Sequence, residues 1–393
     1  MSMKKFTKKM LAIVAAGAMT MGMAMPAMAA DQTTTDTKNN AKEAYISKTY
    51  NTEVNKPMKF NFTATQVKTG DYIVTDDVTC KIPSIEFKET DLSSNAGTYK
   101  KLSDKITFAT FPQAGKYEYT VKESATTEPA INSEHEKLIM SQAEYKMDVY
   151  VVENTEGTLA IDKIIVNKIK DDNNGTATGK VDIGNDVNGN GFNFVNTYVQ
   201  EAGTGTDPSN PGTDPDGYTK NGSLNVSKKI DAQDGTIDSN DRFNFTARFE
   251  FPTGTDANTL GGVKGADGNK ITINKDGTYK FTLQANKNMK FTGVPVGTKI
   301  SVEESATPNY RGSAESVFNG LPQTKVSASK YNEAITVKNT LGQKQNKVDV
   351  TNTYNYVPTT GIIMNNLPYV LMIALCGAAL MAFVAFKRRS LQK

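Results

Sequence analysis

The sequence contains very little cysteine and histidine. Its 393 residues include two cysteines and one histidine, His135. Cys376 lies in a long apolar stretch, which leaves Cys80 without a partner for an intrachain disulfide. Cys80 follows an alternating pattern typical of a strand, so we favour a structural residue over a reactive thiol or thioester. With one histidine, Ser-His-Asp catalysis, Cys-His catalysis and histidine-rich metal sites are poorly supported. We therefore predict that the chain is not an enzyme and uses no cofactor.

One segment carries a weak metal signal. Asp186, Asn188 and Asn190 have the spacing of the first ligands of a calcium loop, and Gly191 follows them. The twelfth position of that loop, however, is Thr197 where a calcium loop has glutamate. We interpret the segment as an Asn/Gly-rich connection into a strand and predict no metal site.

Basic residues are concentrated at the two ends of the chain. The sequence has 45 Lys and Arg against 42 Asp and Glu. Eight of the basic residues, and none of the acidic ones, lie within residues 1–30 and 362–393. The region between these ends is therefore acidic on balance, and the overall positive charge does not indicate a nucleic-acid partner.

The first 30 residues have the pattern of a signal peptide. Four lysines precede an apolar run from Met10 to Met25, and Ala27-Met28-Ala29 provides the small residues of a cleavage site. The apolar run is short for a membrane anchor. We expect residues 1–30 to be removed and the rest of the chain to be exported.

The opposite end combines three features in a fixed order. Val357-Pro358-Thr359-Thr360-Gly361 is followed by an apolar span from Leu367 to Phe386 and then by Lys387-Arg388-Arg389. This order resembles the cell-wall sorting signal of Gram-positive surface proteins. The resemblance implies that a sortase cuts between Thr360 and Gly361 and transfers the threonine carboxylate to an amine. The motif begins with valine where the family usually has leucine, which leaves the identity of the sortase open.

The central region shows the alternation of β-strands. Phe60-x-Phe62-x-Ala64 and Phe243-x-Phe245-x-Ala247 are examples, and Gly, Asn, Asp and Pro separate such segments. Many short strands of this kind predict an all-β fold of two tandem immunoglobulin-like β-sandwiches. Residues 200–219 are almost entirely Gly, Thr, Pro and Asp and are predicted to form a linker. We place the two sandwiches at residues 41–199 and 220–356, the sorting motif at 357–361, and the membrane span and basic tail at 362–393.

The first half places three polar residues in phase with apolar neighbours. Lys48 alternates with Ile46 and Tyr50 near the start of this half. Glu123 ends the strand that contains Tyr117-x-Tyr119-x-Val121, and Asn196 lies in the closing strand. Burying such groups without partners costs several kcal/mol, so their shared direction needs an explanation.

The second half repeats the plan in the same order. Lys228 is in phase with the apolar residues of the opening strand, whereas Lys229 points the opposite way. Glu304 ends a later strand, and Asn352 lies in the closing one. Each residue alone has a simpler explanation, because terminal lysines often extend to solvent and asparagine is common near turns. Two triads in one order make coincidence a poor explanation.

These features together resemble the streptococcal pilin isopeptide-linkage domains and, in layout, the two-domain backbone pilins of Gram-positive bacteria. The resemblance implies a spontaneous amide bond between lysine and asparagine side chains in each sandwich, assisted by glutamate. The bonds would be Lys48–Asn196 with Glu123, and Lys228–Asn352 with Glu304. Burial would favour neutral lysine and protonated glutamic acid. We expect the glutamic acid to polarise the asparagine carbonyl oxygen.

The resemblance also implies a structural role as the backbone subunit of a sortase-assembled pilus. Expected partners are the sortase, other copies of the chain, minor pilins, peptidoglycan and host surface ligands. The chain would then be covalently attached to the wall or to the pilus fibre. The Tyr-Pro-Lys-Asn motif that usually supplies the linking lysine is missing, so Lys168 and Lys180 are the first candidates. The alternative is a monomeric wall-anchored adhesin or stalk protein without such a lysine.

Overall fold

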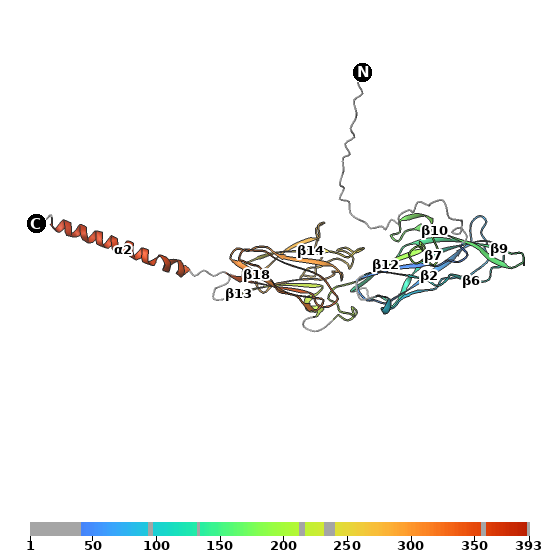
Figure 1. Cartoon of the computed structure of the whole chain (residues 1–393), viewed down its shortest axis with the longest axis horizontal. Helices are drawn as coiled ribbons and strands as arrows, with labels where there is room; N and C mark the ends of the chain where they lie inside the picture. The colour runs from blue at the N-terminus through green and yellow to red at the C-terminus, as the bar shows by residue number, and fades with distance from the viewer. Residues whose placement is uncertain are drawn as a thin grey trace, which may run out of the picture. The chain divides into compact units, whose positions relative to one another are not determined.

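The computed structural model describes residues 41–92, 97–131, 134–211, 217–231, 240–354 and 359–390. The predicted signal peptide, together with Val357 and Pro358 of the predicted sorting motif, lies outside the described residues. The described part consists mainly of β-strands, which confirms the all-β prediction (Figure 1).

Residues 41–200 form one pair of sheets. The four-stranded sheet has the order β5-β1-β12-β8, and the six-stranded sheet has the order β11-β10-β9-β7-β2-β4. Strands β3 and β6 form a small additional pair. The strands are β1 (Ser47–Thr52), β2 (Met58–Val67), β3 (Cys80–Lys81), β4 (Ile85–Phe87), β5 (Gly97–Leu102), β6 (Thr107–Phe108), β7 (Gly115–Glu128), β8 (Glu136–Ile139), β9 (Glu144–Glu153), β10 (Leu159–Lys170), β11 (Thr176–Lys180) and β12 (Asn193–Gln200), with a 3-10 turn at Glu89–Asp91.

Residues 224–354 form a second pair. One sheet has the order β16-β13-β22-β18-β19, with β20 also paired to β18, and the other has the order β15-β14-β17-β21. The elements are α1 (Tyr218–Asn221), β13 (Leu224–Asp231), β14 (Phe243–Glu250), β15 (Thr278–Leu283), β16 (Asn288–Phe291), β17 (Lys299–Glu304), β18 (Tyr310–Phe318), β19 (Leu321–Pro322), β20 (Val326–Ser327), β21 (Ile335–Thr340) and β22 (Lys347–Tyr354).

Aromatic side chains fill the space between facing sheets. In the first sandwich, Tyr50 of β1 contacts Phe60 of β2 with ring centroids 5.3 Å apart, and Phe62 contacts Phe194 at 5.2 Å. In β14, every second residue from Phe243 onward is buried, as the period-two pattern predicts. These edge and tilted ring contacts bury large apolar areas and hold the sheets face to face.

The first and last strands of each sandwich lie side by side. β1 pairs with β12 in parallel, and β13 pairs with β22 in parallel. Each sandwich is therefore closed by its own two ends, and any force applied along the chain pulls on these neighbouring strands.

The predicted linker differs from the structure at its beginning. Gln200, Glu201, Ala202 and Thr204 are buried. Ala202 N–H donates to the carbonyl of Val294 at 2.9 Å, which fixes this segment against a loop of the second sandwich. The composition of the segment does not reveal this order, because it rests on the burial of the small Ala202 side chain and on backbone hydrogen bonds.

Glu201 shows why its segment is ordered. Its Oε1 accepts hydrogen bonds from the Tyr218 hydroxyl at 2.6 Å, from the Ser223 hydroxyl at 2.8 Å and from the Gly293 N–H. Its Oε2 lies 2.7 Å from Nδ1 of His135. A buried carboxylate is tolerated when donors surround it in this way. The single histidine of the chain thus has a structural partner.

A long helix, α2 (Thr359–Ser390), follows the second sandwich in sequence. Its segment from Tyr369 to Arg388 has a mean hydropathy of 2.4 and contains no buried residue, and it is long and apolar enough to cross a membrane. Among the described residues, no other helix is both long and apolar enough to cross a membrane.

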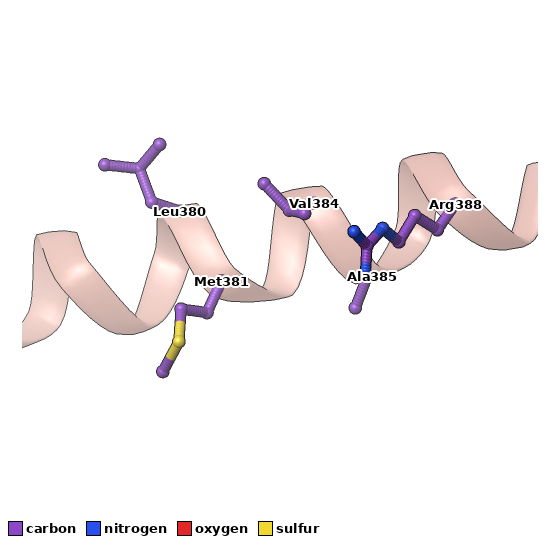
Figure 2. Close-up of a pocket in the computed structure, with 5 residues that line it drawn as sticks. All are labelled: Leu380, Met381, Val384, Ala385 and Arg388. Atoms are coloured by element: carbon purple, nitrogen blue, oxygen red, sulfur yellow. The ribbon is translucent and has the colours of Figure 1, made fainter.

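Figure 2 shows Leu380, Met381, Val384, Ala385 and Arg388 projecting from α2. The shallow hollow they border lacks convergent polar groups, so we assign no ligand to it.

Candidate functional site

The first candidate site joins three side chains from three strands. Lys48 comes from β1, Asn196 from β12, and Glu123 from β7 on the opposite sheet. Oε1 of Glu123 accepts a hydrogen bond from Lys48 Nζ at 2.8 Å and another from Asn196 Nδ2 at 2.8 Å. One carboxylate oxygen therefore holds the amine and the carboxamide together in the core.

The second site repeats this arrangement. Lys228 Nζ lies 2.8 Å from Oε2 and 3.1 Å from Oε1 of Glu304. Asn352 Nδ2 donates to the same Oε1. All three side chains are buried. Lysine and glutamate are 75 positions apart in the first site and 76 in the second, so the two halves follow one plan.

Strand register explains how lysine meets asparagine. Lys48 lies opposite Phe194, two residues before Asn196. Lys228 lies opposite Val350, again two residues before Asn352. Because strand side chains alternate with period two, both pairs point to the same inner face of their sheet. The matching registers give the two sites the same geometry.

An aromatic ring contacts each lysine. Lys48 Nζ lies 4.4 Å from the centroid of Phe60, and Lys228 Nζ lies 4.1 Å from that of Phe243. The sequence pattern did not single out this role, although Phe60 and Phe243 each lie in a strand with alternating apolar residues. The rings shield the amines from water and still offer a weak attraction to a cation.

Burial shifts the charges of both pairs toward neutrality. Loss of hydration lowers the pKa of Lys48 to about 8 and that of Lys228 to about 8, while the nearby glutamates oppose this shift. The same loss of hydration raises the pKa of Glu123 and of Glu304 above the usual range. A neutral amine next to a protonated acid is thus more accessible here than in water. A neutral amine is a nucleophile.

One expected contact differs in the structure. We expected each glutamic acid to face the carbonyl oxygen of its asparagine, but both glutamates face the carboxamide nitrogen. In the first site, the carbonyl oxygen of Asn196 is occupied by another donor, the backbone N–H of Ser141, at 2.8 Å. The glutamates are therefore placed to exchange protons with the two nitrogens.

Two polar atoms of the sites have no hydrogen-bond partner among the described residues. They are Oε2 of Glu123 and Oδ1 of Asn352, and both are buried. Buried polar atoms are rarely left unpaired, and a catalytic role is one of several explanations for the exceptions. Their presence inside the triads suits groups that react with one another.

Neighbouring lysines in β13 allow the register to be tested. Lys228 is fully buried, whereas Lys229 is exposed. If the predicted Lys228–Asn352 amide bond forms, Lys228→Ala should retain one ammonia more than the parent chain. Lys229→Ala should show the parent's ammonia loss, since its side chain faces water. Intact-mass measurement distinguishes them, and the reverse result would mean a register shifted by one residue.

The two candidate linking lysines lie in different environments. Lys168 Nζ lies 3.0 Å from Oδ2 of Asp172 and 5.5 Å from the centroid of Tyr145, and it is about three-quarters buried. Lys180 is exposed at the end of β11, an edge strand. An enzyme that needs an accessible amine would reach Lys180 more easily.

Other residues singled out in the sequence have structural roles. Burial raises the pKa of the Cys80 thiol to about 12, which disfavours the reactive thiolate. Asn190, from the possible calcium loop, donates its side-chain N–H groups to the carbonyls of Tyr45 and Gly184. Within the described ranges, no cluster of three or more His, Cys, Asp or Glu residues could hold a metal ion.

The second sandwich matches a known family profile. Residues 222–354 match a family described as a domain of unknown function, DUF7601. No curated protein matches the chain.

Several solved structures resemble the chain at low sequence identity. The major pilin from Streptococcus pyogenes is 16% identical, covering 80% of this chain and 99% of its own, with a TM-score of 0.33. The T-13 major pilin from the same organism is 18% identical, covering 80% and 98%, with a TM-score of 0.30. A pilus-presented adhesin, Cpa, is 14% identical, covering 49% of this chain and 36% of its own, with a TM-score of 0.25.

Proposed function

We propose that this chain is the structural backbone subunit of a sortase-assembled surface pilus, and that an amide bond between side chains locks each of its two sandwiches. The observation that carries the proposal is the pair of buried Lys-Glu-Asn triads, built with the same register in both halves. A buried charge without chemistry to perform is costly, and two such triads multiply that cost.

The reaction follows from the contacts. Neutral Lys48 Nζ attacks Cγ of Asn196, which forms a tetrahedral centre with negative charge on Oδ1. The protonated Glu123 carboxyl gives its proton to Nδ2 and takes the surplus proton of Nζ in exchange, so that the acid is regenerated. The Cγ–Nδ2 bond then breaks and ammonia leaves. The new Nζ–Cγ amide bond replaces the original carboxamide bond. Lys228, Glu304 and Asn352 react likewise in the second sandwich.

The fold supplies most of the acceleration. Packing holds amine and carboxamide against one carboxylate, which converts a slow bimolecular aminolysis into an intramolecular reaction. Proton transfer by a positioned carboxyl adds a further factor of about 10²–10⁴. Each triad is consumed when it reacts, so this is a single maturation step of the chain on itself.

The bond would reinforce the strands that carry load. It joins the first strand of each sandwich to the last, and these strands are already neighbours. Tension between the ends would then pass through a covalent link and would not have to be borne by the β-sheet hydrogen bonds. By analogy with disulfides, closing so long a loop contributes ~5 kcal/mol to stability. This compensates for the lack of disulfides in an exported protein.

The ends of the chain support export and assembly. The signal-peptide pattern directs secretion, and the sorting motif with α2 would hold the chain at the membrane for a sortase. Joining Thr360 to a lysine of another copy would extend the fibre, and joining it to peptidoglycan would anchor the fibre to the wall. Minor pilins and host surface ligands are further proposed partners.

A wall extract tests the shaft role. For a backbone subunit, we expect a ladder of high-mass species that contain this chain and resist boiling in detergent. Mass spectrometry of the digested ladder should identify Thr360 joined to a lysine of the chain, with Lys180 favoured over Lys168. Lys180→Ala should then collapse the ladder, and Lys137→Ala, at another strand of the same sandwich, should leave it unchanged. A single monomeric band with Thr360 only on peptidoglycan would indicate the wall-anchored adhesin or stalk instead.

A further inference from the structure

The two triads differ at the carbonyl oxygen of the asparagine. In the first sandwich, Ser141 donates its backbone N–H to Oδ1 of Asn196 at 2.8 Å. In the second sandwich, Oδ1 of Asn352 is buried without a donor among the described residues. Gly312 of the neighbouring strand β18 lies opposite Asn352. A Cβ atom added to Gly312 would lie 3.1 Å from Oδ1 of Asn352.

The two sites differ at this oxygen because the strand next to the closing strand ends early in the first sandwich and continues in the second. β8 pairs with β12 only up to Ile139, opposite Thr197. Beyond the end of β8, Ser141 donates its backbone N–H to the side chain of Asn196, the residue before Thr197 in β12. In the second sandwich, β18 continues along β22 on both sides of Gly312, so its backbone groups remain in the ladder.

Asp172 fixes the position of Ser141. Its Oδ1 accepts the Ser141 hydroxyl at 2.6 Å and the backbone N–H of Val195 at 2.9 Å. Its Oδ2 pairs with Lys168 Nζ at 3.0 Å. Asp172 thus ties the turn that carries the donor to the residue just before Asn196.

We infer that the backbone N–H of Ser141 is the oxyanion donor for the Lys48–Asn196 bond and that Asp172 positions it. This inference rests on the proposed amide-bond reaction and adds a group to it. During the attack of Lys48, negative charge develops on Oδ1 of Asn196, where the N–H already points. A fixed donor at such a position in a buried site lowers the barrier without reorganisation.

The Ser141 donor gives Ser141 and Glu123 separate roles in the first site. Because Ser141 already donates to Oδ1, Glu123 can stay on the two nitrogens during the reaction and move protons between them. Among the described residues, Oδ1 of Asn352 has no such donor, so we expect the Glu304 carboxyl to turn toward that oxygen and stabilise the oxyanion. The two bonds therefore form by related but unequal routes.

The test follows bond formation in the mature chain made by cell-free synthesis, with acid quenching at intervals, intact-mass measurement and peptide mapping. Ser141→Pro removes the N–H and should slow the first bond by about a hundredfold, with the second bond unaffected. Ser141→Ala keeps the N–H and should slow it far less. A first bond formed at the parent rate in Ser141→Pro would overturn the inference.

A second pair of variants provides a control for misfolding, because the proline of Ser141→Pro also restricts the backbone. Asp172→Ala should slow the first bond, whereas Asp172→Asn keeps an acceptor oxygen and should restore the parent rate. Hydrogen exchange of β1 and β12 must show equal protection in both variants, so that a rate difference reports positioning and not folding. Equal rates in the two variants would refute the positioning role. A parent chain that loses no ammonia would refute the amide-bond reaction itself.

Discussion

Glu123→Ala and Glu304→Ala are each expected to retain one of the two ammonia molecules that the parent protein loses, so that each mass exceeds by one ammonia the mass calculated for that variant with both bonds formed. The parent should have lost two ammonia molecules, one for each triad. Without the carboxyl, no other group that the described residues place against both nitrogens can move a proton between them. Intact-mass measurement of the folded, secreted chain reads this directly, and an unmodified mass for the parent would refute the proposed bonds.

The same variants should lose thermal stability and resistance to proteases. Loss of one cross-link removes ~5 kcal/mol, which corresponds to a decrease in Tm of roughly 10–20 °C for a domain of this size. Asn196→Ala also prevents the first bond but keeps the Lys48–Glu123 pair. It should therefore melt above Glu123→Ala, which leaves a buried lysine unpaired.

A neighbouring residue provides the matched control. Glu303 precedes Glu304 in β17 but is exposed, so Glu303→Ala changes the same residue type on the opposite face. It should lose two ammonia molecules, as the parent does, with a Tm within a few degrees of the parent. If Glu303→Ala also retained an ammonia, the assignment of the inward-facing acid would be wrong.

The alternation of apolar and polar residues made the lysine and asparagine of each site predictable. Lys48 and Asn196 belong to strands whose apolar residues repeat with period two, so their inward direction could be inferred without knowing the fold. Lys228 could be separated from Lys229 in the same way. The structure adds what a pattern cannot contain: the parallel pairing of first and last strands and the register that brings lysine next to asparagine.

The rest of the first site could not be predicted, because it depends on turns. Ser141 and Asp172 lie in connections between strands, where no periodicity reveals direction. Ser141 acts through its backbone N–H, a group that every residue except proline has. Glu201 was misassigned to a linker for a related reason: its order comes from hydrogen bonds to Tyr218 and Ser223 and not from apolar neighbours.

Changing the sorting motif should have the largest effect on assembly. Thr360→Ala combined with Gly361→Ala is expected to abolish cleavage, so that the precursor stays in the membrane fraction and no high-mass ladder forms. Thr360 lies in the first turn of α2, where the first N–H groups lack intrahelical partners and the helix opens most easily. The scissile bond would thus be in the most accessible part of the helix.

The basic tail provides the complementary experiment. A 20-residue apolar segment from Tyr369 to Arg388 spans about 30 Å as a helix, the thickness of a bilayer core. The cationic residues at its end resist translocation and should hold the chain until the sortase acts. Deleting Lys387 through Lys393 should release uncut chain into the medium. Replacing the basic residues of this tail with other basic residues should preserve retention, because the charge and not the sequence opposes crossing. Retention of the tailless chain in the membrane would show that the apolar helix alone is sufficient.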